Sequence, residues 1–462
     1  ELALLGLFSL FPRLVVRFRR GKLVEYNKLK AKFAVPVLWS YIYSNTLKFT
    51  RFTLRALNIA ISKIGKSPEL GMAIGGFGSI LMANSRFNLA LKYLTMALDM
   101  REKLQDQWGA AQSYQWLGYC HQWKGDYRSS IECFEESARR FKKMGDIYEL
   151  GNSYAGLVLD YTFLADFEKL KHYLDQYYMI TNQTNDFYGI NEAWIYSTPY
   201  FLETGNIDTA EWLGNAAYNY SLDTNILFTQ CTSCIELGRV YLEKRDSQQS
   251  LNYLEKAYEL YRNNSFLKQY TVHIFPALAE SYLYRYISGK DSDSEVANHY
   301  LRKTREFSRK ALSKTRRWPT YYGLALLVNA KYCAICGNKK KAEKLFLQSI
   351  EHNKGIGRRY WLARSYYEYG LFLSQTDSGT AAKKNLESAY SLFTEIGAKR
   401  YIDELRSLLG IKEEDISVSS IERRIDNERL SSVIKLAREI SNIAETENLL
   451  DMILAKAVEI TG

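Results

Sequence analysis

The chain repeats one pattern of small and apolar residues at an interval of forty residues. One position of the pattern, which is small in most copies, falls at Gly78, Gly118, Val158, Thr198 and Gly238. A second small position falls at Ala90, Ser130, Leu170, Ala210 and Ser250, so individual copies depart from the pattern. A repeat of this length is one supersecondary unit, whose apolar face is covered only when neighbouring units stack in series. The interval therefore predicts an array of stacked units and not a single globular core.

Each unit of forty residues has the length of two helices joined by turns. Only 6 of the 462 residues are proline, so little in the sequence interrupts helices. After the fifth clear repeat the phase slips, and helices are predicted at about residues 274–286 and 296–313, with a polar loop insertion near residues 288–295. The register resumes at Ala330 and Gly370, again forty residues apart.

The copy with the clearest turn reads, in order, Tyr114, Leu117, Gly118, a Gly-Asp-Tyr turn at residues 125–127, and Phe134. This order of aromatic, Leu-Gly, turn and aromatic resembles the tetratricopeptide repeat. The resemblance implies an all-α fold, a right-handed superhelical solenoid of helical hairpins whose period here is about forty residues. It covers about eight or nine repeats over residues 34–410 and implies a domain that binds other proteins.

Residues 411–462 differ in character, with an acidic stretch before a predicted linker helix and a second apolar helix. The linker helix places apolar residues three and four apart, at Val433, Leu436, Ile440 and Ile443. A Leu-Leu pair and a final Ala-x-x-Ile-Thr-Gly follow, and this order resembles the first helices of a truncated GAF domain. Two alternatives stay open: an unrelated helix pair that caps the solenoid, and a coiled coil that joins two copies in a homodimer.

Residues 1–33 are apolar and basic, and we interpret them as a helical join to a preceding domain. The order of join, array and GAF-like start is similar to the middle of large bacterial signalling proteins. In those proteins a kinase-like or STAND-like ATPase domain precedes the array, and a GAF domain with an output domain follows it. Because the first residue is Glu1 and the last stretch stops inside a folding unit, we expect a part of a longer polypeptide.

Cysteine usage and hydropathy predict a cytoplasmic protein. The 6 cysteines are scattered and lack the density of a secreted disulfide scaffold. The apolar run at residues 2–11 is shorter than the ~18 residues that a membrane span needs, so no span is expected.

Two patterns that carry chemistry in other proteins are better explained by helix packing. Cys231 and Cys234, and again Cys333 and Cys336, have the spacing of zinc ligands, but the repeat separates the two pairs in the stack. We therefore expect buried structural cysteines. The glycines of residues 75–78 lie inside a helical pattern and lack the lysine of a phosphate-binding loop. We expect no metal, no cofactor and no catalytic residue, so the chain is not expected to be an enzyme.

The resemblance implies that the first helices of the repeats form a concave inner wall. Their inner positions mix amides, aromatic rings and both signs of charge, at Gln112, Gln115, Tyr119, Gln122, Asn152, Glu192, Arg239, Lys331, Arg364 and Tyr367. A groove of this composition suits a protein, a peptide or a neighbouring domain of the same chain. We interpret the chain as a regulatory scaffold that couples an upstream nucleotide-binding domain to a downstream sensor and output domain.

The net charge of +11 keeps a second interpretation open, in which a helical-repeat domain binds nucleic acid through its basic faces. Such binding needs lysine and arginine aligned in one slot across the repeats. The inner slots instead alternate among Gln, Glu, Arg and Tyr. Protein partners are therefore the leading expectation, and nucleic acid is the alternative.

Overall fold

The computed structural model describes residues 23–29, 41, 45–289, 294–375 and 379–411. The chain divides into two compact units, Glu1–Leu409 and Gly410–Gly462. The predicted GAF-like helices, the homodimer helix and most of the N-terminal join lie outside the described residues. All of the described helices belong to the first unit.

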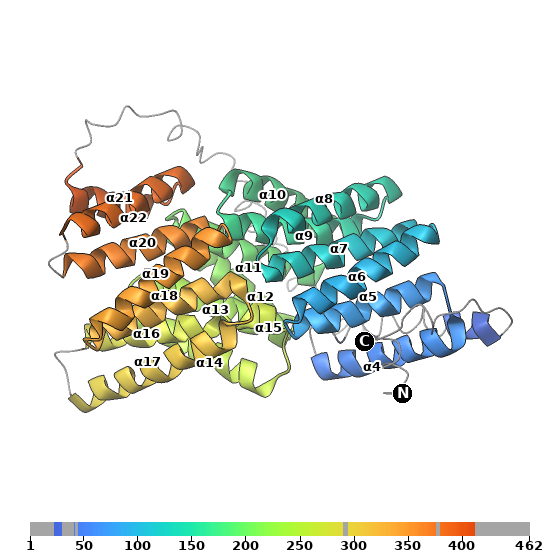
Figure 1. Cartoon of the computed structure of the whole chain (residues 1–462), viewed down its shortest axis with the longest axis horizontal. Coiled ribbons are helices and arrows are strands. Elements are labelled where there is room, and N and C mark those ends of the chain that lie inside the picture. The colour runs from blue at the N-terminus through green and yellow to red at the C-terminus, as the bar shows by residue number, and fades with distance from the viewer. Residues whose placement is uncertain (1–22, 30–40, 42–44, 290–293, 376–378, 412–462) are drawn as a thin grey trace, which may run out of the picture. The chain divides into compact units, whose positions relative to one another are not determined.

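The described residues form a series of eight helical hairpins, as the repeat predicts (Figure 1). The first helices of the hairpins are α5 (Pro68–Ala83), α7 (Gln107–Lys124), α9 (Ile147–Leu164), α11 (Phe187–Glu203), α13 (Leu227–Glu243), α16 (Ile274–Ser288), α18 (Pro319–Ile335) and α20 (Arg359–Ser374). The second helices are α6 (Phe87–Lys103), α8 (Tyr127–Met144), α10 (Phe167–Gln183), α12 (Ile207–Asp223), α14 (Ser247–Asn263), α17 (Ser294–Thr315), α19 (Lys339–Gly355) and α21 (Gly379–Ile396). The others are α4 (Thr46–Ile59), the π-helix η1 (Ala60–Ile64), α15 (Lys268–Thr271) and α22 (Lys399–Leu409).

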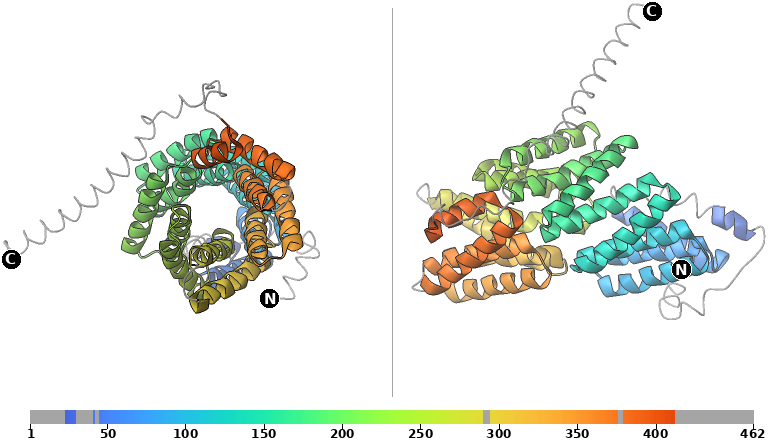
Figure 2. Two further views of the ribbon diagram at one scale, coloured as in Figure 1. Left: turned by 90° about the vertical axis from the view of Figure 1, so that its left-hand side faces the viewer. Right: turned by 90° about the horizontal axis from the view of Figure 1, so that it is seen from above.

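The first helices form the inner layer of a superhelix. Each packs against its own second helix and also against the first helix of the next hairpin, as α7 does with α8 and α9. The superhelix makes enough of a turn for its end to meet its beginning, since α18 contacts α7 and α20 contacts α9. The left view of Figure 2 shows these helices wound around a common axis. The predicted all-α solenoid is confirmed.

One turn geometry joins the helices from α5 to α14, where it recurs every twenty residues. The last residue of each turn before the next helix cap has a positive φ, at Ser85, Gln105, Gly125, Gly145, Ala165, Asn185, Gly205, Asn225 and Arg245. Most of these residues precede an Asp or Asn whose side chain caps the next helix, as Asp126 accepts a hydrogen bond from the Ser129 backbone N–H. Such caps satisfy backbone donors that the first turn of a helix leaves free.

Small residues stand where two helices meet closely, as the sequence predicts. A Cβ on Gly78 would lie 2.7 Å from Cδ2 of Leu94, and one on Gly156 would overlap the ring of Phe134. The interpretation of the glycines at residues 75–78 as a packing surface is therefore confirmed.

The phase slip has two structural causes. The short helix α15, which the repeat pattern does not predict, stands between α14 and α16. In addition, α17 has 22 residues where its counterpart α12 has 17. The predicted helices at 274–286 and 296–313 are confirmed as α16 and α17, although α16 ends later than predicted and α17 is longer at both ends.

The cysteine prediction is right for three of the four paired residues and wrong for the fourth. Cys231, Cys234 and Cys333 are buried, whereas Cys336 is exposed because it caps the C-terminal end of α18. In the described part of the chain, no cluster of His, Cys, Asp and Glu side chains is placed to hold a metal ion. Among the described helices, none has both the length and the apolar character needed to cross a lipid bilayer.

Candidate partner-binding pocket

A pocket opens into the interior of the superhelix, on the inner faces of its first helices. It is lined from α7, α9, α11, α13, α16, α18 and α20, together with Tyr270 of α15. Its space, including the part open to solvent, is about 1250 Å³. Aromatic rings make much of the wall, from Trp123, Phe163, Tyr188, Tyr196, Phe228, Tyr270, Tyr321, Tyr360 and Trp361.

The pocket closes because the two ends of the superhelical turn are bonded to each other. Thr320 at the start of α18 donates a hydrogen bond to the carbonyl of Gln122 (3.4 Å) and accepts one from Tyr127 (3.2 Å). The guanidinium of Arg358, just before α20, lies 4.8 Å from the centre of the Phe163 ring of α9. These contacts join residues that are almost two hundred positions apart in the chain.

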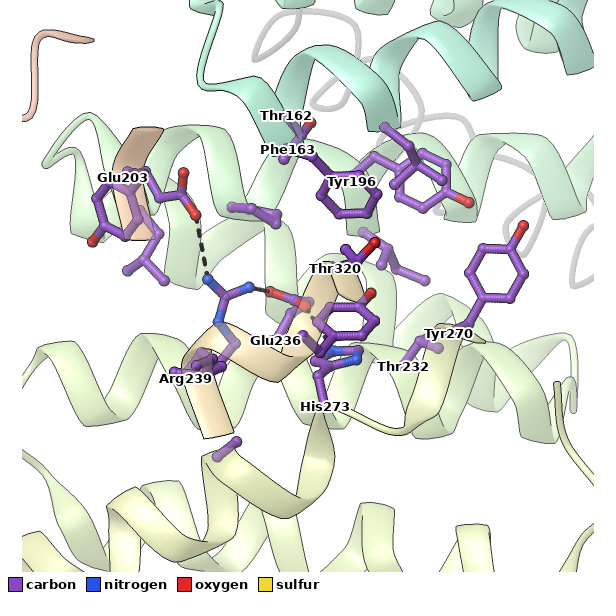
Figure 3. A pocket seen from close by; sticks show the side chains of 18 of the residues that line it. Thr162, Phe163, Tyr196, Glu203, Thr232, Glu236, Arg239, Tyr270, His273 and Thr320 are labelled. Atoms are coloured by element: carbon purple, nitrogen blue, oxygen red, sulfur yellow. Dashed lines mark hydrogen bonds and ion pairs between the residues drawn. The ribbon is translucent and has the colours of Figure 1, made fainter. Parts of the chain in front are cut away.

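Most charged side chains within the pocket lie beside a side chain of opposite charge. Arg239 lies between two carboxylates, 2.7 Å from Glu236 and 3.4 Å from Glu203 (Figure 3). The ring nitrogen Nε2 of His273 lies 3.4 Å from Glu236. Neighbouring helices thus supply opposite charges to the same buried site.

A second cluster of ion pairs ties the last hairpins to the middle of the array. Arg364 of α20 lies 2.7 Å from Glu243 of α13 and 3.4 Å from Glu280 of α16. Lys331 of α18 lies 2.9 Å from Glu280. Arg400 of α22 also lies 2.7 Å from Glu243. Each of these pairs joins two different helices, so the cluster fixes their relative positions.

Burial and pairing act in opposite directions on the pocket glutamates. Burial tends to raise the pKa of Glu236, but the charges of Arg239 and His273 hold that pKa below its usual value. Burial likewise opposes ionisation of Glu280, and Lys331 and Arg364 hold its pKa below the usual value. Burial raises the pKa of Glu203 to about 7, although Arg239 and Arg358 act to lower it.

Two charged residues of the pocket have no oppositely charged partner within ion-pair distance among the described residues. Glu192 accepts hydrogen bonds from the hydroxyls of Tyr196 (2.6 Å) and Tyr177 (2.9 Å). Arg358, which is 6% exposed, donates to the carbonyl of Thr320 (2.9 Å), and its Nε makes no hydrogen bond. Burial raises the pKa of Glu192 to about 7.

The structure places the ten predicted groove residues in three groups. Glu192, Arg239 and Arg364 line the pocket, and Lys331 reaches it through its ion pair with Glu280. Tyr367 does not line the pocket; it is buried beside Tyr401, at 5.4 Å between ring centres.

The remaining five predicted residues lie away from the pocket, where the side chains of four of them bond to a neighbouring helix and that of Asn152 bonds within α9. The side-chain amide of Gln115 donates to the carbonyl of Glu149, and that of Gln122 donates to the carbonyl of Gly156. Gln112 is bonded to Arg101, Tyr119 donates to the carbonyl of Asn152, and the side chain of Asn152 donates to Glu149. Polar residues at inner slots of the early repeats thus serve helix packing, because the first helices lie close enough there to share hydrogen bonds.

Several pocket residues are missing from the sequence-based prediction, although the sequence contains signals for some of them. Glu203 and Glu243 stand forty residues apart, each at the last position of a first helix. Arg358 stands in the helix-cap slot that Asp or Asn fills in most other turns, and it makes no side-chain cap bond. His273 and Tyr270 belong to the phase slip, where the repeat offers no register to follow.

Comparisons with known proteins support the repeat assignment. The tetratricopeptide repeat model matches residues 111–143 and 232–264, which correspond to the hairpins α7–α8 and α13–α14. A Rap protein complexed with competence and sporulation factor is similar in structure, with a TM-score of 0.59, 9% identity, and 81% of this chain and 99% of that chain covered. The apo form of the quorum sensor NprR from B. thuringiensis has a TM-score of 0.51 and 13% identity, with 80% and 99% covered. No curated protein matches the sequence.

The fold, the pocket and these comparisons define the class. The chain is a helical-repeat protein that contains tetratricopeptide repeats. Its likeness to the Rap and NprR structures, at 9% and 13% identity, is a likeness of fold.

Proposed function

We propose that the chain is a non-catalytic binding and regulatory domain that holds a peptide or an extended protein segment in the interior pocket. The observation that carries this proposal is the pocket itself, which seven first helices line over a full turn of the superhelix. Its wall combines aromatic rings with arginines and glutamates, the composition that favours recognition of protein side chains.

The fold relatives are consistent with such a role. The Rap structure contains a bound factor, and NprR is a quorum sensor, so this superhelix serves proteins that respond to a bound signal. Here too, helices from both ends of a superhelical turn form the pocket, so a bound ligand can change how the two ends pack together. A ligand that touches α9 and α20 together favours the closed turn over an open one, because it binds the closed form better.

We further propose that this change of the superhelix is what couples a preceding nucleotide-binding domain to a following sensor and output domain. The array stands between residues 1–33 and 411–462, which are the segments proposed to lead to those domains. A ligand-dependent change in superhelix closure would alter the distance between the two ends of the array.

Nucleic acid is less well suited to this pocket. Of the three arginines that line the pocket, Arg239 and Arg364 each lie 2.7 Å from a glutamate carboxylate, whereas Arg358 has no such partner among the described residues. A phosphate backbone would have to displace these carboxylates to reach the cations, and its own charge would be repelled by those that remained.

Selection of random hexapeptides displayed on phage, with the whole 462-residue chain as bait, tests the proposal. Enriched peptides should bind the wild-type chain and lose affinity when Thr232, which lines the pocket, is changed to Phe. Leu324→Trp fills the same pocket from α18 and serves as a second blocking variant. Helix content by circular dichroism verifies that each variant is folded.

The matched control is Thr394→Phe, which adds the same ring at an exposed position of α21 and should leave peptide binding unchanged. Selected peptides that bind both pocket variants as well as the wild type would refute the proposal. A labelled RNA pool that binds in their place, with affinity falling steeply as salt rises, would support the nucleic-acid alternative.

A further inference from the structure

One carboxylate of the pocket differs from the others in its surroundings. Five glutamates line the pocket, and four of them lie within 3.4 Å of a basic nitrogen: Glu203, Glu236, Glu243 and Glu280. Glu192 is the fifth, and within the described residues no lysine, arginine or histidine lies at ion-pair distance from it. The described part of the chain therefore supplies no counter-charge to this carboxylate.

Two tyrosine hydroxyls hold the Glu192 carboxylate in a fixed position. Tyr196 donates to Oε1 (2.6 Å) and Tyr177 donates to Oε2 (2.9 Å). An ionised carboxylate has about four lone-pair sites, so each oxygen keeps acceptor capacity after these two bonds. The group is thus oriented and still able to accept from a ligand.

Aromatic rings surround the space that Glu192 faces. Tyr188 and Tyr196 come from the same helix, α11, while Tyr270 comes from α15 and Phe228 from α13. Figure 3 shows Tyr196 and Tyr270 on separate segments bordering the open space of the pocket. Aromatic faces attract cations, most strongly where water is excluded.

The arginines of the pocket lie toward its other end, near Glu203 and Glu243. Glu192 and Glu203 are eleven positions apart on α11, which separates them by about 16 Å along the helix axis. Arg239 lies beside Glu203, so its positive charge is close to the C-terminal end of α11. Among the described residues that line the pocket, Glu192 is thus the glutamate without a nearby cation.

We propose that Glu192, together with the rings of Tyr188, Tyr196 and Tyr270, binds a cationic group of the partner, either a lysine or arginine side chain or a free terminal ammonium. The proposal rests on the proposed function, since it assigns the chemistry of one end of the same pocket. A ligand cation supplies the counter-charge that the described residues do not, and the surrounding rings add cation–π attraction. An anionic group at this position would be repelled by Glu192.

The experiment uses random hexapeptide pools in which one fixed position holds arginine, lysine, citrulline or glutamate. Citrulline is a neutral isostere of arginine, so the comparison of these two pools isolates the charge without any protein variant. Each pool is passed over the immobilised whole chain, and the retained fraction is measured by mass spectrometry. A parallel set with acetylated N-termini distinguishes a side-chain cation from the terminal ammonium.

We expect the wild-type chain to retain the arginine and lysine pools about tenfold better than the citrulline pool. If the terminal ammonium is the bound group, acetylation of the N-terminus should instead lower the retained fraction about tenfold. Glu192→Gln, which keeps the shape of the side chain and one acceptor oxygen for the tyrosine hydroxyls, should remove either preference. Glu259→Gln removes a charge from the exposed face of α14 and should preserve it.

Two outcomes would overturn the inference, and they differ in what they say of the proposed function. Equal retention of all pools, lost on Thr232→Phe, would mean that the pocket binds peptides without a cation site. Retention of no pool by the wild-type chain would refute both proposals together.

Discussion

At the scale of single residues, the pocket shows how neighbours decide the ionisation of one residue type. Burial raises the pKa of Glu192 to about 7, and only tyrosine hydroxyls oppose it. Glu236 is also buried, yet Arg239 and His273 hold its pKa below the usual value. The difference between the two glutamates is the presence of a cation, because desolvation acts on both.

The stability of the chain should therefore depend on pH through Glu192. Its folded-state pKa of about 7 lies above the ordinary value of 4.5, so between these values the folded chain binds more protons than the unfolded chain. Stability from this group falls as pH rises through that window. Glu192→Gln should thus gain stability relative to the wild type on going from pH 5 to pH 8, measured by urea denaturation.

The control for this measurement is Glu136→Gln. Burial is slight at Glu136, and hydrogen bonds from Arg139 and Arg140 lower its pKa to about 2. That carboxylate is ionised in both the folded and the unfolded state above pH 5. Its removal should therefore change the free energy of unfolding by the same amount at every pH in this range. If the free energy of unfolding varied with pH in the same way for Glu192→Gln and the wild type, the raised pKa of Glu192 would be contradicted.

At the scale of elements, the helical hairpins depend on turn geometry and on close approach at a few small residues. Positive φ at twenty-residue intervals lets one short turn serve both kinds of connection, within a hairpin and between hairpins. Gly156 of α9 meets the buried ring of Phe134 from α8, where a side chain has no room. The repeat therefore constrains backbone conformation and side-chain size together.

Gly156→Ala should destabilise the chain by about 1–3 kcal/mol, because the added methyl overlaps a rigid ring that is itself fully buried. Gly355→Ala makes the same change at the last residue of α19, where a Cβ would meet nothing within 4 Å. Its effect should be within about 0.5 kcal/mol of zero. Urea midpoints of the two variants, measured side by side, give the comparison. A similar loss for both would show that the contact with Phe134 does not decide the cost in stability.

At the scale of the whole superhelix, distant parts of the chain are joined by buried ions. Arg364 of α20 is 4% exposed as a side chain and pairs with Glu243 of α13, which is 121 positions away. It also lies 3.4 Å from Glu280 and 3.6 Å from Glu368. Removing one side of such a buried cluster leaves charges without partners, which costs more than the pair itself contributes.

Arg364→Met keeps the length of the side chain and removes its charge, and it should destabilise the chain by about 3 kcal/mol or more. Arg139→Met is the matched control, since Arg139 is 63% exposed and pairs with Glu136 on the same helix. That change should cost less than about 1 kcal/mol. Tryptophan fluorescence during urea unfolding reports on both, because Trp361 and Trp123 line the pocket. Comparable costs for the two variants would mean that the buried cluster does not hold the superhelical turn.

The sequence by itself determined the helical hairpins, their order and their register. A helix and a turn depend on residues close in the chain, so the sequence alone contains the small residue found in most repeats and the Asp or Asn that follows most turns. The same local pattern placed Glu192, Arg239 and Arg364 on the inner wall, where all three line the pocket.

Only the tertiary structure decided which inner residues share a pocket. Whether α20 meets α9 depends on the small rotation added at each repeat and on the extra residues around α15, and these rotations accumulate over the whole array. Gln115 and Gln122 occupy inner positions of α7, but their side-chain amides donate hydrogen bonds to α9. Arg358 lies in a turn and yet lines the pocket. The helices that contact these side chains are far away in the chain. The repeat pattern does not show which of these distant helices come together.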